Sequence, residues 1–226
     1  GRATAAGNAW GLPAGCAVVG GTTDSIAAFL ACSVDGASIN VEPGRAVTSL
    51  GSTTALKLVS DVKIDDAATG VYSHRLDDAW LVGGASNAGC RVLRDFSFGD
   101  DELRTLSESL DVGATNAKGI YPLSAAGERF PFNDPEKRPV VPDHADADRE
   151  TVLHDLLVGI ADVERLGYAA LAERGATPLV SVQTAGGGSK NPQWRALREA
   201  MLGVPVLGAA NTDASFGAAA LALKGA

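Results

Sequence analysis

Cysteine and histidine are scarce in this chain, and their spacing argues against two kinds of site. The three cysteines, Cys16, Cys32 and Cys90, are odd in number and form no C-x-x-C pair. We therefore interpret them as reduced, mostly buried thiols rather than as a disulfide framework. The three histidines lie far apart along the chain, so the sequence suggests no zinc site and assigns no residue to a metal.

Long apolar runs and an excess of positive charge are also lacking. No run reaches the ~20 residues that a membrane-spanning helix needs. No charged-then-apolar segment opens the chain as a secretory signal would. The net charge is -8, which argues against unaided binding to nucleic acid, because phosphate backbones are held by clustered Lys and Arg. The sequence therefore predicts neither a nucleic-acid partner nor a transmembrane segment.

What is present fits a large core built from alternating strands and helices. Hydrophobic residues make up 46% and charged residues 20% of the 226 residues, as in ordinary globular proteins. Apolar runs and capping residues predict strands at 16–20, 46–50, 55–59, 71–76, 79–84, 179–185 and 204–208, and helices at 24–32, 87–96, 100–110, 149–174, 192–202 and 213–223. A proline-rich irregular excursion is expected over 113–146. This order predicts one α/β domain over residues 1–226.

Asp24 stands at the junction between the predicted strand 16–20 and the predicted helix 24–32. A carboxylate at this point lies at the mouth of the sheet, where α/β proteins place their ligands. It could act as a general base toward a substrate hydroxyl. Thr23 or Asp24 could equally serve as the N-cap of the helix. Local sequence leaves both interpretations open.

Two glycine-containing turns are candidates for holding a phosphate. The turn at 49–54 combines Gly51 with small residues and hydroxyls, so it is either an anion-binding turn or a simple hairpin. The segment 184–191 places three consecutive glycines before a helix, where bare backbone and the helix N-terminus favour an anion. It matches neither the Walker A pattern nor G-x-G-x-x-G. Trp194 is either a purine-stacking face or core, and 83–87 is either a ligand loop or a capped helix start.

Taken in order, these segments resemble the C-terminal half of an FGGY-type carbohydrate kinase. The similarity is carried by GTTDSIAAFLA (21–31), AVTSLGST (46–53), WLVGGASNAG (80–89), GERFP (127–131), TAGGGSKN (184–191), LGVPV (202–206) and NTDASFGAAALA (211–222). The resemblance implies an actin-like, ribonuclease-H-like ATPase fold, that is, α/β with a mixed sheet flanked by helices. The residues at 21–31 and 127–131 are similar to the corresponding segments of D-ribulose kinases of cyanobacteria and plant plastids. Ser25 stands where xylulose and glycerol kinases usually have Gln.

The resemblance also implies roles for individual residues. Asp24 matches the catalytic base, and Ser25 matches its neighbour on the sugar. The positions implied at the nucleotide are Gly51, Ser52 and Thr53 at the terminal phosphates, Gly187, Gly188 and Ser189 at the adenosine and inner phosphates, and Asn191 and Trp194 near the adenine. The implied cofactors are ATP and Mg²⁺, and the implied reaction converts D-ribulose into D-ribulose 5-phosphate. The implied location is the chloroplast stroma or the cytoplasm.

The N-terminal half of such a kinase is not contained in these residues. The chain begins at Gly1 rather than Met, so we expect a fragment, one piece of a split enzyme, or a degenerate relative. The predicted partner is an N-terminal kinase half, from the same precursor or another chain, and this half alone is expected to be inactive. The alternative is an idle kinase-like domain that serves as a structural or docking subunit, although the intact Asp24 and glycine loop argue against it. A ribokinase-type interpretation of NTDASFGAAA fails, because Asn-Thr precedes Asp213 where Gly-Ala-Gly is required.

Overall fold

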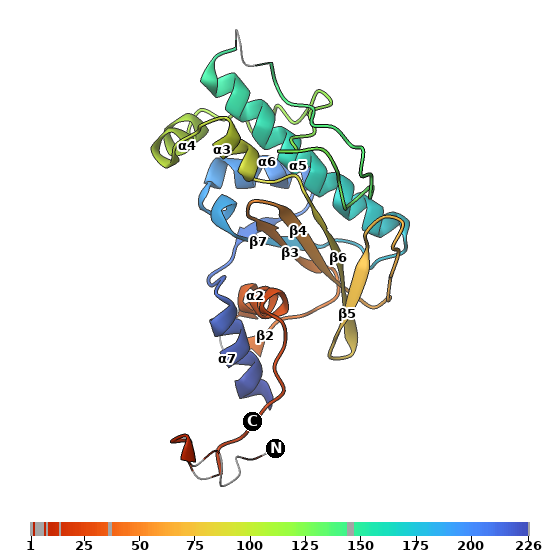
Figure 1. The fold of residues 1–226 in the computed structure, drawn as a ribbon, viewed down its shortest axis with the longest axis vertical. Coiled ribbons are helices and arrows are strands. Elements are labelled where there is room, and N and C mark those ends of the chain that lie inside the picture. Colours follow the sequence, from red (N-terminus) through yellow and green to blue (C-terminus); the bar gives the residue numbers. More distant parts are fainter. Residues whose placement is uncertain are drawn as a thin grey trace. The chain divides into compact units, whose positions relative to one another are not determined.

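The computed structural model describes residues 2, 7, 9–13, 15–35, 38–143 and 147–225. The chain divides into two compact units. Gly1–Asn40 and Ala210–Ala226 belong to unit 1, and Val41–Ala209 form unit 2. In Figure 1, unit 1 carries the red-orange and darkest blue parts of the ribbon. The single domain expected over residues 1–226 stays a prediction.

Unit 1 is built on two helices that touch through a glycine. Helix α2 spans Asp24–Cys32 and helix α7 spans Ala214–Gly225, and they lie side by side in Figure 1. A Cβ added at Gly217 would come within 1.8 Å of the Ala27 carbonyl oxygen. The missing side chain therefore lets the two helix backbones meet. A short antiparallel pair, β1 (Val34–Asp35) with β2 (Ser38–Ile39), follows α2.

The buried strand predicted at 16–20 does not form, and that prediction was wrong. Ala17 makes an isolated bridge to Arg2, and Val18 is 55% exposed. An apolar run becomes a strand when a neighbouring strand takes up its backbone hydrogen bonds. Among the residues of unit 1 that the structure describes, the strand ladder is the β1–β2 pair alone. The missing element is a neighbouring strand, which the apolar pattern of residues 16–20 cannot predict.

Unit 2 is organised around a mixed six-stranded sheet. Its strands are β3 (Arg45–Leu50), β4 (Thr54–Ser60), β5 (Tyr72–Leu76), β6 (Ala79–Ser86), β7 (Ser181–Ala185) and β8 (Val206–Gly208). They lie in the order β5-β6-β4-β3-β7-β8. The β3–β7 and β7–β8 pairs are parallel, and the other pairs are antiparallel. The α/β class with a mixed sheet is therefore confirmed.

Helices cover this sheet on the side shown uppermost in Figure 1. They are α3 (Arg91–Asp95), α4 (Asp100–Ser107), α5 (Arg149–Glu173) and α6 (Pro192–Leu202). The long helix α5 begins where the Asp148 carboxylate accepts a hydrogen bond from the Thr151 amide at 2.9 Å, a normal N-cap. Helix α6 ends at Gly203 in the left-handed conformation. None of the helices in the described residues is long and apolar enough to cross a membrane.

Phe130 anchors the irregular segment that the sequence predicts over 113–146. Its side chain is buried, and it lies against two glycines, Gly84 in β6 and Gly167 in α5. A Cβ at Gly84 would come within 2.4 Å of the Phe130 ring, and one at Gly167 within 2.8 Å. The ring therefore fills the space that these glycines leave between sheet and helix. The three cysteines are all free thiols, as expected, but only Cys32 is buried, and Cys16 and Cys90 are half-buried.

We expect Gly217→Val to destabilise unit 1, because the new side chain would overlap the Ala27 carbonyl oxygen in α2. Forced overpacking of this kind costs about 1–3 kcal/mol of unfolding free energy. Ala218→Val, at an exposed position of the same helix, introduces the same β-branched side chain without the overlap. Calorimetric unfolding of both variants measures the difference. Equal midpoints would show that α2 and α7 are not in close contact.

Candidate active site

The triple-glycine segment follows strand β7 directly and is shaped by close packing. Gly186 has φ +81°, a backbone conformation that glycine adopts readily. A Cβ there would lie 2.5 Å from the Leu50 carbonyl oxygen. At Gly188 a Cβ would lie 2.6 Å from the Trp194 ring and 2.7 Å from the Leu50 Cβ, whereas at Gly187 it would meet nothing within 4 Å. The loop is thus seated on the core at Gly188 and open at Gly187.

Asn191 and Ser189 hold the end of this loop in place. The loop continues as a short 3-10 turn, η1 (Gly187–Lys190), into helix α6. The Asn191 side chain accepts a hydrogen bond from the Trp194 amide at 2.9 Å and donates one to Ser107 Oγ at 2.7 Å. Ser189 Oγ donates to the Gly186 carbonyl oxygen at 2.7 Å. The N-terminus of α6 therefore follows the glycines in a fixed geometry.

Trp194 belongs to the core, which corrects the purine-stacking alternative. Its side chain is 2% exposed, and its indole nitrogen donates to the Leu157 carbonyl oxygen at 2.9 Å. A ring without an exposed face cannot stack on a purine. The Trp194 ring instead packs against Gly188. Of the two interpretations that local sequence left open, the one as core is confirmed.

The turn at 51–53 lies beside the glycine loop. Strands β3 and β7 are parallel neighbours, so the turn and the loop emerge at the same edge of the sheet. Leu50, the last residue of β3, is fully buried and contacts both Gly186 and Gly188. The structure therefore brings together the residues predicted at the two ends of the nucleotide phosphates, in the turn and in the loop.

A neighbouring segment supports the turn from the other side. The Cys90 amide donates to the Gly51 carbonyl oxygen at 2.8 Å. A Cβ at Gly89 would lie 2.6 Å from Thr53 Cα and 2.7 Å from the Ser52 carbonyl oxygen. Burial raises the pKa of the Cys90 thiol to about 11, so it stays protonated at neutral pH. Ser52 and Thr53 themselves are exposed.

Glu128 is a structural anchor of the site edge that sequence reasoning missed. Its buried carboxylate accepts hydrogen bonds from Ser86 Oγ at 2.6 Å, the Asn87 amide at 2.6 Å and Tyr121 Oη at 2.7 Å. Burial, followed by the Glu128 charge, raises the pKa of Tyr121. These contacts hold the non-helical segment after β6, and α3 begins only at Arg91. The helix start predicted at 87 is therefore wrong. The sequence signal that could have pointed to Glu128 is the GERFP motif, which contains it and to which the sequence analysis assigns no role.

Asp24 and Ser25 belong to unit 1 and are both exposed. Asp24 is the first residue of α2, and its carboxylate accepts a hydrogen bond from the Ser25 amide at 2.7 Å. The N-cap position is Thr23, which makes no side-chain capping bond. The N-cap position predicted for Thr23 is therefore confirmed, and that for Asp24 is not. The residues predicted to bind the nucleotide all lie in unit 2. The roles of Asp24 and Ser25 at the sugar therefore stay a prediction.

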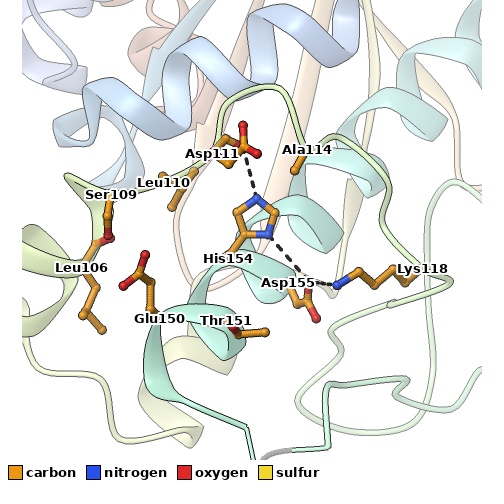
Figure 2. Close-up of a pocket in the computed structure, with 10 residues that line it drawn as sticks. All are labelled: Leu106, Ser109, Leu110, Asp111, Ala114, Lys118, Glu150, Thr151, His154 and Asp155. Carbon is orange, nitrogen blue, oxygen red and sulfur yellow. Dashed lines mark hydrogen bonds and ion pairs between the residues drawn. The ribbon is translucent and has the colours of Figure 1, made fainter.

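Two cavities of unit 2 are lined by other residues. One, of about 240 Å³, lies between the end of α4 and the first turns of α5, and Figure 2 shows His154 and Lys118 beside it. His154 Nε2 lies 3.2 Å from the Asp111 carbonyl oxygen, and Lys118 pairs with Asp155 at 2.9 Å. The other, of about 400 Å³, lies between α6 and β8. No predicted site residue lines either cavity.

Within the described ranges, no three His, Cys, Asp or Glu side chains gather in a way that could hold a metal ion. In phosphate-transferring enzymes Mg²⁺ is held by substrate phosphates together with one or two carboxylates. An Mg²⁺ ion held in that way would not need three protein ligands.

The fold and the paired loops define this chain as an α/β domain of the actin-like ATPase class found in sugar kinases. The model of the FGGY family of carbohydrate kinases, C-terminal domain, matches residues 46–226. The chain belongs to this family.

Solved structures agree with the family match. A xyloylose kinase from Brucella ovis is 28% identical with a TM-score of 0.82, over 99% of this chain and 46% of its own. A xylulose kinase from Rhodospirillum rubrum is 23% identical with a TM-score of 0.76, over 100% and 46%. A glycerol kinase from Plasmodium falciparum, solved with ADP, is 16% identical with a TM-score of 0.70, over 93% and 44%. The chain thus spans less than half the length of these kinases.

We expect Gly188→Ala and Gly187→Ala to differ sharply in stability, although they change neighbouring glycines in the same way. The new methyl group at Gly188 would overlap Trp194 and Leu50, and at Gly187 it would meet open space. Overpacking should cost about 1–3 kcal/mol at Gly188, and the change at Gly187 should stay within about 0.5 kcal/mol. Urea unfolding followed by circular dichroism measures both. Equal losses would contradict the seating of the loop on Trp194.

Proposed function

We propose that this chain is the nucleotide-binding half of an ATP-dependent kinase for a ketopentose, with D-ribulose as substrate and D-ribulose 5-phosphate as product. The observation that carries the proposal is the meeting of the turn 51–53 and the loop 186–188 over Leu50. Two backbone loops at the carboxyl edge of parallel strands suit the phosphates of a nucleotide, because exposed amides can approach them without a side chain in the way.

The open side of the glycine loop is where the nucleotide is proposed to lie. Gly187 has free space beside it, and Ser52 and Thr53 are exposed on the neighbouring turn. The partial positive charge at the N-terminus of α6 favours the phosphate charges. Bound Mg²⁺ would neutralise charge that develops on the transferred phosphoryl group. The net charge of -8 does not prevent this, since local amides rather than the overall charge hold the phosphates.

Asp24 is proposed as the general base. Its carboxylate is exposed at the start of α2, so it can accept the proton of a sugar hydroxyl. The freed oxygen forms a bond to the γ-phosphorus, and the bond from that phosphorus to the β–γ bridging oxygen breaks. ADP leaves with the electron pair. Ser25, in place of the Gln that the resemblance leads one to expect in xylulose and glycerol kinases, supports D-ribulose as the sugar.

The complete activity is proposed to need an N-terminal half in addition to this chain, because the matched kinases are more than twice as long as the part that it covers. Orientation of two substrates between two walls can supply ~7–11 kcal/mol of a barrier. This half alone should therefore be inactive even where it binds nucleotide. The chloroplast stroma or the cytoplasm is the proposed location.

We expect Gly187→Val to weaken ADP binding to the 226-residue chain at least about tenfold, which is about 1.4 kcal/mol. The side chain would occupy the open side of the loop without disturbing the core. Gly99→Val is the matched control, because Gly99 lies outside the predicted loops and a Cβ there also meets nothing within 4 Å. Titration calorimetry measures both affinities. Unchanged affinity in a folded Gly187→Val chain would remove the loop from the site.

We expect Asp24→Asn to lower turnover by about 10²-fold or more while ADP binding survives, because an amide cannot accept the proton. The assay is coupled ADP release with Mg-ATP, D-ribulose and, in parallel, D-xylulose, using this chain together with an N-terminal kinase half. Ser215→Ala, which changes an exposed hydroxyl in α7, is the control. Turnover in Asp24→Asn close to that of the unmodified chain would refute the assignment of the base, and a preference for D-xylulose would refute the assignment of the sugar.

A further inference from the structure

A fully buried ion pair lies behind the two loops. Arg198 in α6 and Glu164 in α5 have side chains that are 1% and 0% exposed. Two bonds join them, from Arg198 Nε to Glu164 Oε2 at 2.6 Å and from Nη2 to Oε1 at 2.7 Å. A two-bond contact of this kind fixes the relative geometry of both groups. Since the guanidinium is almost completely buried, it cannot itself be a ligand of the nucleotide.

The ion pair reaches both strands that carry the loops. Thr48 Oγ1 in β3 donates to Glu164 Oε1 at 2.5 Å, and Arg198 Nη1 donates to Thr184 Oγ1 in β7 at 2.8 Å. Thr48 and Thr184 are direct partners in the parallel register, and both are buried. We call these four residues, Thr48, Glu164, Arg198 and Thr184, the clamp. It ties two helices to one point on each of two neighbouring strands.

The clamp lies a short distance before each loop. Gly51 follows Thr48 by three residues, and Gly186 follows Thr184 by two. At about 3.3 Å per residue in a strand, each threonine lies within about 7–10 Å of its loop along the chain. The loops also touch each other, since Leu50 lies against Gly186 and Gly188. A displacement of one strand should therefore appear in both loops.

We propose that the clamp is a positioning device that sets the spacing of the turn 51–53 and the loop 186–188 for the two ends of the nucleotide phosphates. The inference rests on the proposed function of these loops. A buried ion pair is a poor source of stability, because the cost of removing two charges from water offsets their attraction. Apolar side chains of similar volume can replace such a pair without loss of stability, but they cannot hold two strand hydroxyls in register. Positioning is therefore the property that distinguishes the clamp from ordinary core.

The first test replaces Thr184 by Val, which keeps the shape of the side chain and removes the hydroxyl. Amide hydrogen exchange and ADP titration are measured on the 226-residue chain. We expect faster exchange in both loops, including the turn 51–53 on the other strand, and ADP affinity weaker by about tenfold. Thr184→Ser, which restores a hydroxyl, should recover both. Exchange and affinity equal to those of the unmodified chain would overturn the proposal.

A matched control separates positioning from a general loss of stability. Ser60 is buried at the opposite end of β4 and accepts a hydrogen bond from the Thr177 amide at 3.1 Å. Ser60→Ala should lower the unfolding midpoint without affecting loop exchange or ADP affinity. If it speeds exchange in both loops as much as Thr184→Val does, the clamp has no special role.

A second variant keeps the proposal testable should Thr184→Val fail to fold. The double change Glu164→Leu with Arg198→Met removes the charges together and preserves a packed core. We expect it to fold, with faster loop exchange and weaker ADP binding. Loss of folding in both variants would overturn the proposal, since the clamp would then be a stability element. If the unmodified chain binds no ADP, the proposed function fails, and loop exchange alone decides for or against the clamp.

Discussion

The parallel pairing of β3 with β7 is the constraint on which the site depends. Parallel neighbours end at the same edge of a sheet, so the turn after β3 and the loop after β7 emerge together. The register sets Ser49 opposite Ala185 and brings Leu50 next to Gly186. An antiparallel pairing would have placed the two loops at opposite edges. Strands β4 to β6, helices α3 to α5 and the segment around Phe130 lie between these strands in sequence, so together they supply the long connection that a parallel pair requires.

Glycine gives this site its shape by leaving space rather than by adding chemistry. Gly186 and Gly188 let the loop lie on Leu50 and Trp194, and Gly89 lets the next segment reach the turn at Thr53. Each of these positions would collide with backbone or an aromatic ring if it carried a side chain. The proposed nucleotide surface is therefore shaped by bare glycine backbone, and Leu50 and Trp194 act as supports. In unit 1 the same device, at Gly217, brings α7 against the helix that begins with Asp24.

Local signals in the sequence predicted most of the elements and the site loops. The helices at 24–32 and 192–202 have the expected bounds. For 192–202 the reason is local, because Asn191 caps its N-terminus and Gly203 ends it. The paired strands of unit 2 and the order of the loops were also expected, since apolar alternation and turn residues are local properties. The strand at 16–20 failed because its hydrogen bonds depend on a partner that a local pattern does not contain.

The sequence by itself thus determined the α/β class, the family resemblance and the identity of the glycine loops. Tertiary structure decided which polar residues meet: Glu128 with Asn87, and Glu164 with Arg198 and Thr48. It also decided that Trp194 is core. The physical reason is that periodicity, capping and glycine conformation are set by neighbours along the chain. Burial and buried hydrogen-bond partners are set by residues far apart in sequence, which meet only when the strands and helices have packed.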